Sequence, residues 1–181
     1  YETVVQLVAS AHKIIFTHEH WDHIDAIFDP KVIDTSPKTA VITNAQLNSK
    51  HAHPLLKKQS IKTAFKGLIN QNDYFKPAPG IVLIETPGHS PGSQIIFVKL
   101  SNGNEFLFIG DISYRRYNIL RKKAKPLLVS LLTSENNTEV GKQISSLHEI
   151  ENRKINKLHI IPAHETEYIE NLISRGIIRQ L

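Results

Sequence analysis

Four side chains able to bind a metal ion lie close together near the start of the chain. The segment Thr17-His18-Glu19-His20-Trp21-Asp22-His23 carries them at the spacing His-x-His-x-Asp-His. Alternate residues of an extended chain point the same way, so His18 and His20 can bind one ion. A turn after them would let Asp22 and His23 reach a second ion. Neutral imidazoles and carboxylates at this density are what divalent ions such as zinc select, so a merely polar surface loop is the less favoured interpretation.

Three further ligand-type residues follow segments that have the composition of buried strands. His89 lies in Thr86-Pro87-Gly88-His89-Ser90-Pro91-Gly92-Ser93 after the apolar run 81–85, Asp111 follows 105–109, and His164 follows 157–161. Loops at strand ends commonly carry functional residues. Each of the three alone would be weak evidence, because a single histidine after a strand is more often structural. Together with the first motif they give a candidate site of seven residues: His18, His20, Asp22, His23, His89, Asp111 and His164.

The elements that must position these residues alternate between strands and helices. Short β-branched or aromatic runs predict strands at 13–17, 39–43, 81–85, 94–100, 105–109 and 157–161, with a hairpin turn at 101–104. Apolar residues at helical spacing predict helices over 2–11, 24–28 and from about 166 to near Gly176. Asn44 is the expected N-cap of a further helix, and Thr138 that of an amphipathic one.

The segment 48–79 is polar, rich in lysine and contains three prolines. It is expected to form a helical and loop excursion over the surface that could roof the site. Its His51-Ala52-His53 is a second His-x-His. Because lysines surround it and no apolar strand precedes it, we interpret it as a solvated surface pair.

Composition indicates one globular domain over residues 1–181, with 40% hydrophobic and 22% charged residues. The absence of cysteine excludes disulfides, thiolate ligands and a cysteine nucleophile. The net charge is +5. A basic run of Arg115, Arg116, Arg121, Lys122, Lys123 and Lys125 is interpreted as a solvated face, since only Tyr114 and Tyr117 offer the interleaved aromatics of a nucleic-acid site. No stretch has the length and apolarity of a membrane span.

Four motifs occur along the chain in this order: Thr-His-x-His-x-Asp-His, Thr-Pro-Gly-His-Ser-Pro-Gly-Ser, Phe-Ile-Gly-Asp and a late Pro-Ala-His. They resemble the ordered motifs of the metallo-β-lactamase-fold hydrolase superfamily, and the resemblance covers nearly the whole chain. It implies an α+β fold, an αββα four-layer sandwich with a metal site along one edge of its two sheets. In that family the residues matching His18, His20 and His89 bind the first metal. Those matching Asp22, His23 and His164 bind the second, and the carboxylate matching Asp111 bridges the pair.

One departure concerns the start of the chain. Family members usually have several strands before the first motif, and only 17 residues precede it here. There is also no methionine, even at position 1. We therefore expect a processed or truncated form that lacks N-terminal strands, or a sequence from which residues are missing. No signal peptide is visible, which favours the cytoplasm but does not fix the compartment. The oligomeric state is undetermined.

The ligand set predicts a dinuclear hydrolase. Two divalent ions, zinc in the first place and iron or manganese as alternatives, would lie roughly 3.5–4 Å apart and lower the pKa of a bridging water from 15.7 towards about 7, which yields a hydroxide nucleophile. Asp22 could also orient the hydroxide or carry a proton to the leaving group. Thr17 and Glu19 are expected to be structural rather than catalytic.

Asp111-Ile112-Ser113-Tyr114 narrows the choice of substrate. In the N-acyl-homoserine lactone lactonases of this superfamily, a tyrosine three residues beyond the bridging aspartate lies over the metals. Tyr114 is similarly placed and could bind the substrate carbonyl or stabilise an oxyanion, although packing of its ring under 115–125 is an equal alternative. Leu127, Leu128, Leu131 and Leu132 could line a groove for an acyl chain or belong to the core. The expected substrate is thus a small lactone or similar carboxylic ester.

Other functions stay open at this stage. A thioesterase like hydroxyacylglutathione hydrolase (glyoxalase II) is the first alternative, but only 17 residues follow His164, too few for that enzyme's C-terminal helical region. A β-lactamase is disfavoured because Asp111 stands where many of those enzymes have cysteine. A metal-dependent nuclease or phosphodiesterase would need an inserted domain or arm for which the chain has no room, so nucleic acid is not the expected partner. A non-catalytic metal or flavin-partner module is the last alternative.

Overall fold

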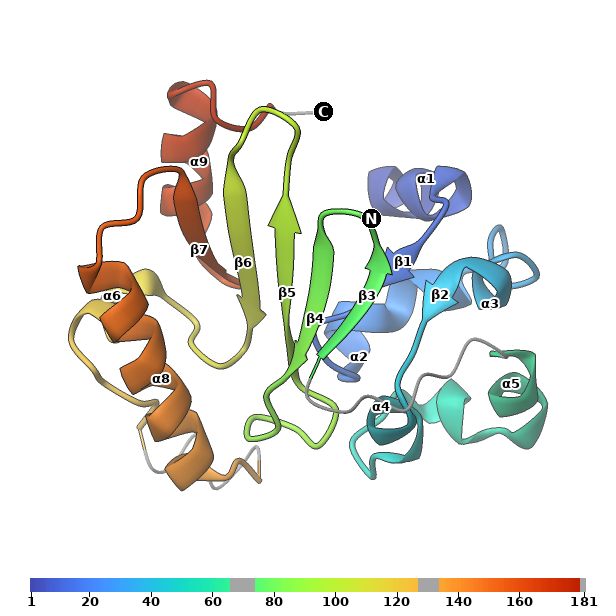
Figure 1. Ribbon diagram of the computed structural model, residues 1–181. Coiled ribbons are helices and arrows are strands. Elements are labelled where there is room, and N and C mark those ends of the chain that lie inside the picture. The colour runs from blue at the N-terminus through green and yellow to red at the C-terminus, as the bar shows by residue number, and fades with distance from the viewer. Residues whose placement is uncertain (66–73, 127–133, 180–181) are drawn as a thin grey trace.

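A five-stranded β-sheet forms the centre of the computed structural model, which describes residues 1–65, 74–126 and 134–179 (Figure 1). Its strands lie in the order β3 (Tyr74–Ala78), β4 (Ile81–Glu85), β5 (Gln94–Lys99), β6 (Glu105–Gly110) and β7 (Leu158–Pro162). Neighbouring strands are antiparallel except β6 and β7, which are parallel. A parallel pair requires a crossover, and α6 (Arg116–Leu120) and α8 (Asn137–Asn152) lie in it. The carboxyl ends of β6 and β7 therefore lie side by side.

A second, smaller sheet packs against one face of the first. It consists of β1 (Ile14–Ile15) and β2 (Ala40–Val41), paired in parallel. Ile15 and Val41 face the large sheet and contact the cluster around Leu83 and Ile96. The opposite face of the small sheet contacts a core built around the remaining N-terminal elements. These are α1 (Glu2–Ser10), α2 (Trp21–Ile24), η1 (Asp25–Phe28), α3 (Ser36–Thr39), α4 (Asn44–Asn48), η2 (Pro54–Lys57) and α5 (Gln59–Ala64).

Helices cover the other face of the large sheet. Ile109 and Ile160 pack against Ile144 and Leu147 of α8, all at most 2% exposed, and burying each such side chain contributes about 1.5–3 kcal/mol. α9 (Thr166–Ser174) packs on the same face as the small sheet, over β6 and β7, through Leu172. The layers run helix, sheet, sheet, helix, which confirms the predicted αββα sandwich. In the described residues the second β layer consists of β1 and β2.

Part of the large sheet lies open between β1 and α9. Phe108 is 36% exposed and Leu100 40% exposed. Together with Ile81, Ile96 and Val98 on the same face, Phe108 lines an apolar groove that reaches Thr17 and His23. Among the described residues, no helix combines the length and the apolar composition that crossing a bilayer requires.

The strands expected from sequence are present, with β4 at the predicted bounds and β1 and β2 shorter than predicted. One strand was missed. β3 lies inside the segment 48–79 that we expected to be helix and loop, and it pairs Phe75 with Leu83 of β4. Lys76 and Pro77 interrupt the apolar pattern, so the strand was not predicted. Proline is tolerated in a strand at the edge of a sheet, and β3 is an edge strand.

Two helix starts differ from the prediction. Thr43, not Asn44, caps α4, because its hydroxyl accepts a hydrogen bond from the Gln46 backbone while the Gln46 side chain accepts one from the Thr43 backbone. This is a capping box. Asn136, not Thr138, caps α8 through Glu139. The short helix α6 within the basic run was not predicted.

We predict that Gly110→Ala destabilises the fold. Gly110 has φ +54°, and an added Cβ would lie 2.8 Å from the Cβ and Oγ1 of Thr17. A side chain in this conformation costs about 1–3 kcal/mol before the clash is counted. Chemical denaturation should therefore show a lower free energy of unfolding by at least that amount.

Gly141→Ala is the matched control. Gly141 lies inside α8, and an added Cβ meets no atom within 4 Å. This change should raise the free energy of unfolding by about 0.5–1 kcal/mol. Equal effects of the two substitutions would contradict the assigned backbone geometry at Gly110.

Candidate metal centre

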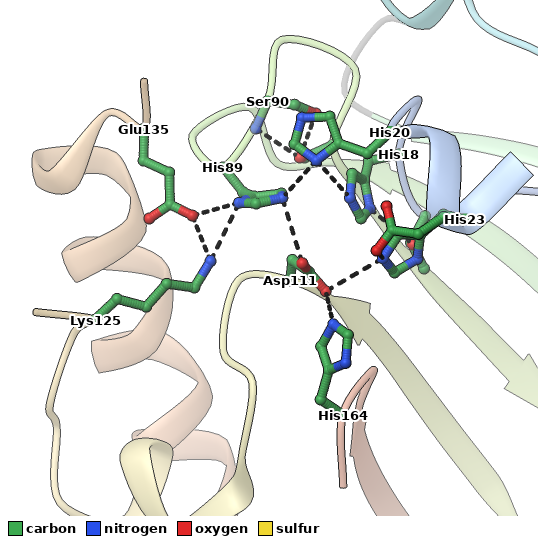
Figure 2. A network of polar contacts seen from close by, with 12 residues as sticks. His18, His20, His23, His89, Ser90, Asp111, Lys125, Glu135 and His164 are labelled. Carbon is green, nitrogen blue, oxygen red and sulfur yellow. Dashed lines mark hydrogen bonds and ion pairs between the residues drawn. The ribbon is translucent and has the colours of Figure 1, made fainter. Parts of the chain in front are cut away.

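The structure brings the seven predicted ligand residues together at one end of the two sheets. All of them except Asp22 are labelled in Figure 2. His18 and His20 lie in the loop after β1, and Asp22 and His23 lie in α2, whose N-cap is His20. His89 lies in the loop between β4 and β5. Asp111 and His164 follow the carboxyl ends of β6 and β7, which the parallel pairing places next to each other.

Three imidazoles form the first cluster. The Nδ1 atom of His20 lies 3.1 Å from Nε2 of His18 and 3.1 Å from Nε2 of His89. Zinc–nitrogen bonds of 2.0–2.1 Å in a tetrahedral arrangement would separate ligand nitrogens by about 3.3 Å. The three nitrogens are therefore spaced as the ligands of a single ion would be. His18 and His89 are buried, at 1% and 3% exposure.

Asp22, His23 and His164 form the second cluster. The Nε2 atom of His23 lies 3.5 Å from Oδ2 of Asp22. The ligand atoms of all three residues lie within 4.8 Å of one another. This cluster is far more open than the first, because the side chains of Asp22 and His164 are 43% and 50% exposed. Small molecules can reach the second cluster from solvent.

Asp111 lies between the two clusters with one oxygen toward each. Its Oδ2 atom lies 3.5 Å from Nε2 of His89, while its Oδ1 atom lies 3.5 Å from His23 and 3.3 Å from His164. The residue is only 6% exposed. A carboxylate in this position can contact a cation in either cluster.

Two buried atoms at the centre have no hydrogen-bond partner. These are Nε2 of His23 and Oδ1 of Asp111. Leaving a buried polar atom unpaired costs roughly 1–3 kcal/mol, and native proteins do so rarely. A cation bound between these atoms would satisfy both, so the donor set fits divalent metal ions.

The histidines are also in the protonation state that metal binding needs. Burial lowers the pKa of His18, His20 and His23, and the neighbouring imidazoles lower that of His18 further. For His23 the Asp111 carboxylate opposes this effect without reversing it. These imidazoles are neutral at pH 7 and can offer a lone pair.

Glu19 joins the two loops that carry the first cluster. Its buried carboxylate accepts hydrogen bonds from the Ser90 hydroxyl at 2.9 Å and the Gly92 backbone at 3.3 Å. These contacts agree with the structural role expected for Glu19. Gln46 contributes as well, since its amide donates to the carbonyls of Phe16 and Gly92.

Behind His89 lies an ion pair that the sequence did not reveal. The Glu135 carboxylate contacts both Nδ1 of His89 and Nζ of Lys125. Burial raises the pKa of Glu135, but the hydrogen bonds from His89 and Lys125 outweigh it and lower the pKa overall. Lys125 is 6% exposed, so the expectation of a solvated basic face was wrong for this residue. Arg116 is likewise paired, with Glu151.

Tyr114 lies beside the open cluster. The centroid of its ring is 5.1 Å from that of His164, with the rings perpendicular. The ammonium of Lys125 lies 4.0 Å from the ring centroid of Tyr114. Burial raises the pKa of the phenol, and nearby carboxylates, Asp111 first, raise it further. The phenol therefore keeps its proton at neutral pH and can donate a hydrogen bond.

The prediction of a solvated pair at His51 and His53 was wrong. His53 stacks on Phe28 with ring centroids 4.4 Å apart, and its Nε2 lies 3.2 Å from Asp25. His51 is half-buried, and its ring centroid lies 6.0 Å from that of His20. The apolar residues Leu127, Leu128, Leu131 and Leu132, predicted to line a groove or the core, fall outside the described residues.

Comparison with known proteins supports this reading of the chain. No protein-family model matches it. Among curated proteins, N-acyl homoserine lactonase AiiA of Bacillus thuringiensis subsp. kurstaki is 28% identical over 109 residues, which are 58% of this chain and 40% of that protein. The chain thus spans well under two thirds of the length of the curated relatives it matches.

Three solved structures are similar in fold. An N-acyl homoserine lactone hydrolase with N-hexanoyl-L-homoserine bound at its catalytic metal centre matches with a TM-score of 0.60 and 20% identity, over 88% of this chain and 58% of that one. The dizinc quorum-quenching lactonase AidC matches with a TM-score of 0.56 and 14% identity, over 88% and 59%. AbOPH, a hydrolase of the β-lactamase superfamily, matches with a TM-score of 0.54 and 19% identity, over 87% and 58%.

These likenesses agree with the layer order, the motif positions and the clustered ligands. The chain has the metallo-β-lactamase fold, the fold of the N-acyl homoserine lactonases that it resembles in sequence.

Proposed function

We propose that this chain holds two divalent metal ions, zinc in the first place, and hydrolyses a lactone or a related carboxylic ester. The position of Asp111 carries the proposal, because its two oxygens face two adjoining clusters of metal-binding side chains. The first site would consist of His18, His20 and His89 and the second of Asp22, His23 and His164, with Asp111 shared.

The sequence relatives support the choice of a lactone. The curated proteins matched are N-acyl homoserine lactonases. AidC, which is similar in fold, is a dizinc lactonase. Such a pair of ions would polarise the substrate carbonyl and provide a water molecule of lowered pKa.

The side chains around the open cluster have distinct parts to play. Asp22 is exposed enough to meet the substrate and can accept a proton from the attacking water and pass it to the leaving alkoxide. The protonated phenol of Tyr114 can donate a hydrogen bond to the substrate carbonyl as negative charge develops on it. His18 and His89 lie too deep to contact the substrate and would hold an ion instead.

Two of the six cations in the basic run are paired within the protein, which argues against their use in binding nucleic acid. Within the basic run, Lys125 is buried against Glu135 and Arg116 is paired with Glu151. Neither is free to neutralise a phosphate backbone, which is the main source of affinity in nucleic-acid binding.

We predict that metal removal abolishes hydrolysis of an N-acyl homoserine lactone and that zinc restores it. His18→Ala and Asp111→Ala should each lower kcat/KM by more than about 100-fold, because losing even the groups behind a metal ligand typically costs 10–100-fold. Metal content by atomic emission and lactone hydrolysis by pH-stat would be measured together.

His12→Ala, an identical change at an exposed position, is the control and should retain activity and metal. A glutathione thioester and a phosphodiester serve as alternative substrates. Faster turnover of either one would exclude the lactone, and full activity of the His18 or Asp111 variant would exclude the metal assignment.

We predict that Tyr114→Phe lowers kcat by roughly 10–100-fold, with a smaller effect on KM. The reason is that a donor to the developing oxyanion acts mainly in the transition state. Phenylalanine keeps the ring, so a tyrosine that only packs would tolerate the change. Tyr117→Phe, at a 55% exposed position, is the matched control. Unchanged kinetics in Tyr114→Phe would leave packing as the role of this ring.

A further inference from the structure

The ion pair between Lys125 and Glu135 is deeply buried beside the candidate metal centre. The two side chains are 2% and 0% exposed. Desolvating such a pair costs several kcal/mol per ion, and an apolar pair of similar volume is often at least as stable. Stability alone is therefore a weak explanation for its presence. The contacts of the ion pair indicate a role in positioning His89.

The contacts fix which nitrogen of His89 carries the proton. One oxygen of Glu135, Oε1, contacts both Nδ1 of His89 and Nζ of Lys125. An ionised carboxylate only accepts hydrogen bonds and an ammonium only donates them. The Nζ atom of Lys125 also lies 3.2 Å from Nδ1, but two donors do not hydrogen-bond to each other. Glu135 therefore accepts from both, and the His89 imidazole carries a proton at Nδ1. Its Nε2 atom is left with a lone pair directed at His20 and Asp111, 3.1 Å and 3.5 Å away.

We propose that Glu135 and Lys125 are positioning residues that orient His89 as a metal ligand. The proposal rests on the function proposed above. Glu135 holds the Nδ1–H group, and Figure 2 shows it on the side of His89 opposite Asp111. A carboxylate that accepts the second N–H of a ligating histidine fixes the ring and strengthens its basicity.

Lys125 keeps the Glu135 carboxylate hydrogen-bonded to His89, so that Glu135 does not itself become a metal ligand. A carboxylate so close to a metal centre could otherwise turn toward the cation. The ammonium holds Oε1 in place and cancels its charge, so the pair adds no net charge to the centre. Lys125 also lies 4.0 Å from the centroid of the Tyr114 ring, a favourable cation–π distance. The same lysine thus supports both a metal ligand and the proposed oxyanion donor.

The test measures metal affinity directly, by competition with a chromophoric chelator for zinc. Glu135→Gln keeps the shape of the side chain but removes its charge and presents an amide that cannot accept from both partners at full strength. It should lower the affinity for one of the two zinc ions by about 10–100-fold and leave the affinity for the other within a few-fold of wild type. Lys125→Met should have a similar effect, and Lys125→Arg, which keeps the charge, should restore most of the affinity.

Glu139→Gln is the matched control. Glu139 lies on the first turn of α8, a few residues from Glu135, and forms an exposed pair with Lys142. Its loss should leave both zinc affinities unchanged. Thermal unfolding of each metal-free variant shows whether it is folded before zinc is added.

The outcomes separate the two proposals. If wild type binds two zinc ions and Glu135→Gln binds both with wild-type affinity, the pair is merely structural and the inference is wrong, while the proposed function stands. The same holds if Glu135→Gln lowers only the melting temperature. If wild type binds no zinc, the proposed function fails and this inference fails with it.

Discussion

Close crowding of metal-binding donor atoms is the constraint on which the rest of this site depends. Nitrogens of His18 and His89 approach that of His20 to 3.1 Å, and Asp111 presents an oxygen to each cluster. In water such groups would protonate or separate. Burial removes both options for His18, because it lowers the pKa of the imidazole and encloses the side chain. A bound cation would accept lone pairs from several of these donors at once, including the unpartnered His23 Nε2 and Asp111 Oδ1. The protein must hold the donors in place for it.

Much of the surrounding structure serves this purpose. Glu19 ties the loop of the first motif to the turn at Ser90 and Gly92. Gln46 connects the α4 cap to the same two loops. The parallel pairing of β6 and β7 brings Asp111 beside His164 although they are 53 positions apart in the sequence. The Glu19 and Gln46 contacts cross from one layer to another, whereas the β6–β7 pairing acts within the large sheet. The site and the packing of the sandwich therefore depend on each other.

The sequence was informative where chemistry is local. The spacing of His18, His20, Asp22 and His23 and the proline- and glycine-rich segment around His89 were enough to predict these ligand candidates. Short β-branched or aromatic runs were enough for the long strands. It was less informative where tertiary contacts decide. β3 carries Pro77 and is a strand because the edge of β4 is available to it. The N-cap at Thr43 did have a local signal, because Gln46 three residues later completes a capping box. The prediction of Asn44 overlooked that signal.

Lys125 and Glu135 had no such signal. A lysine within a basic run has every appearance of a solvated residue, and its partner is ten positions away. Only the fold shows that both face His89, which lies 46 residues from Glu135. Buried ion pairs formed across loops are set by three-dimensional packing, so no pattern of spacing or periodicity in a single sequence can identify them.

The unequal exposure of the two clusters has a kinetic consequence. An ion held by His18, His20 and His89 would have to leave past buried side chains, whereas one held by Asp22 and His164 would face solvent across side chains that are 43% and 50% exposed. The two would exchange with the medium at different rates. The half-loaded protein would then be a long-lived species of defined composition, with the enclosed position filled and the outer one in equilibrium with whatever cations the surroundings supply.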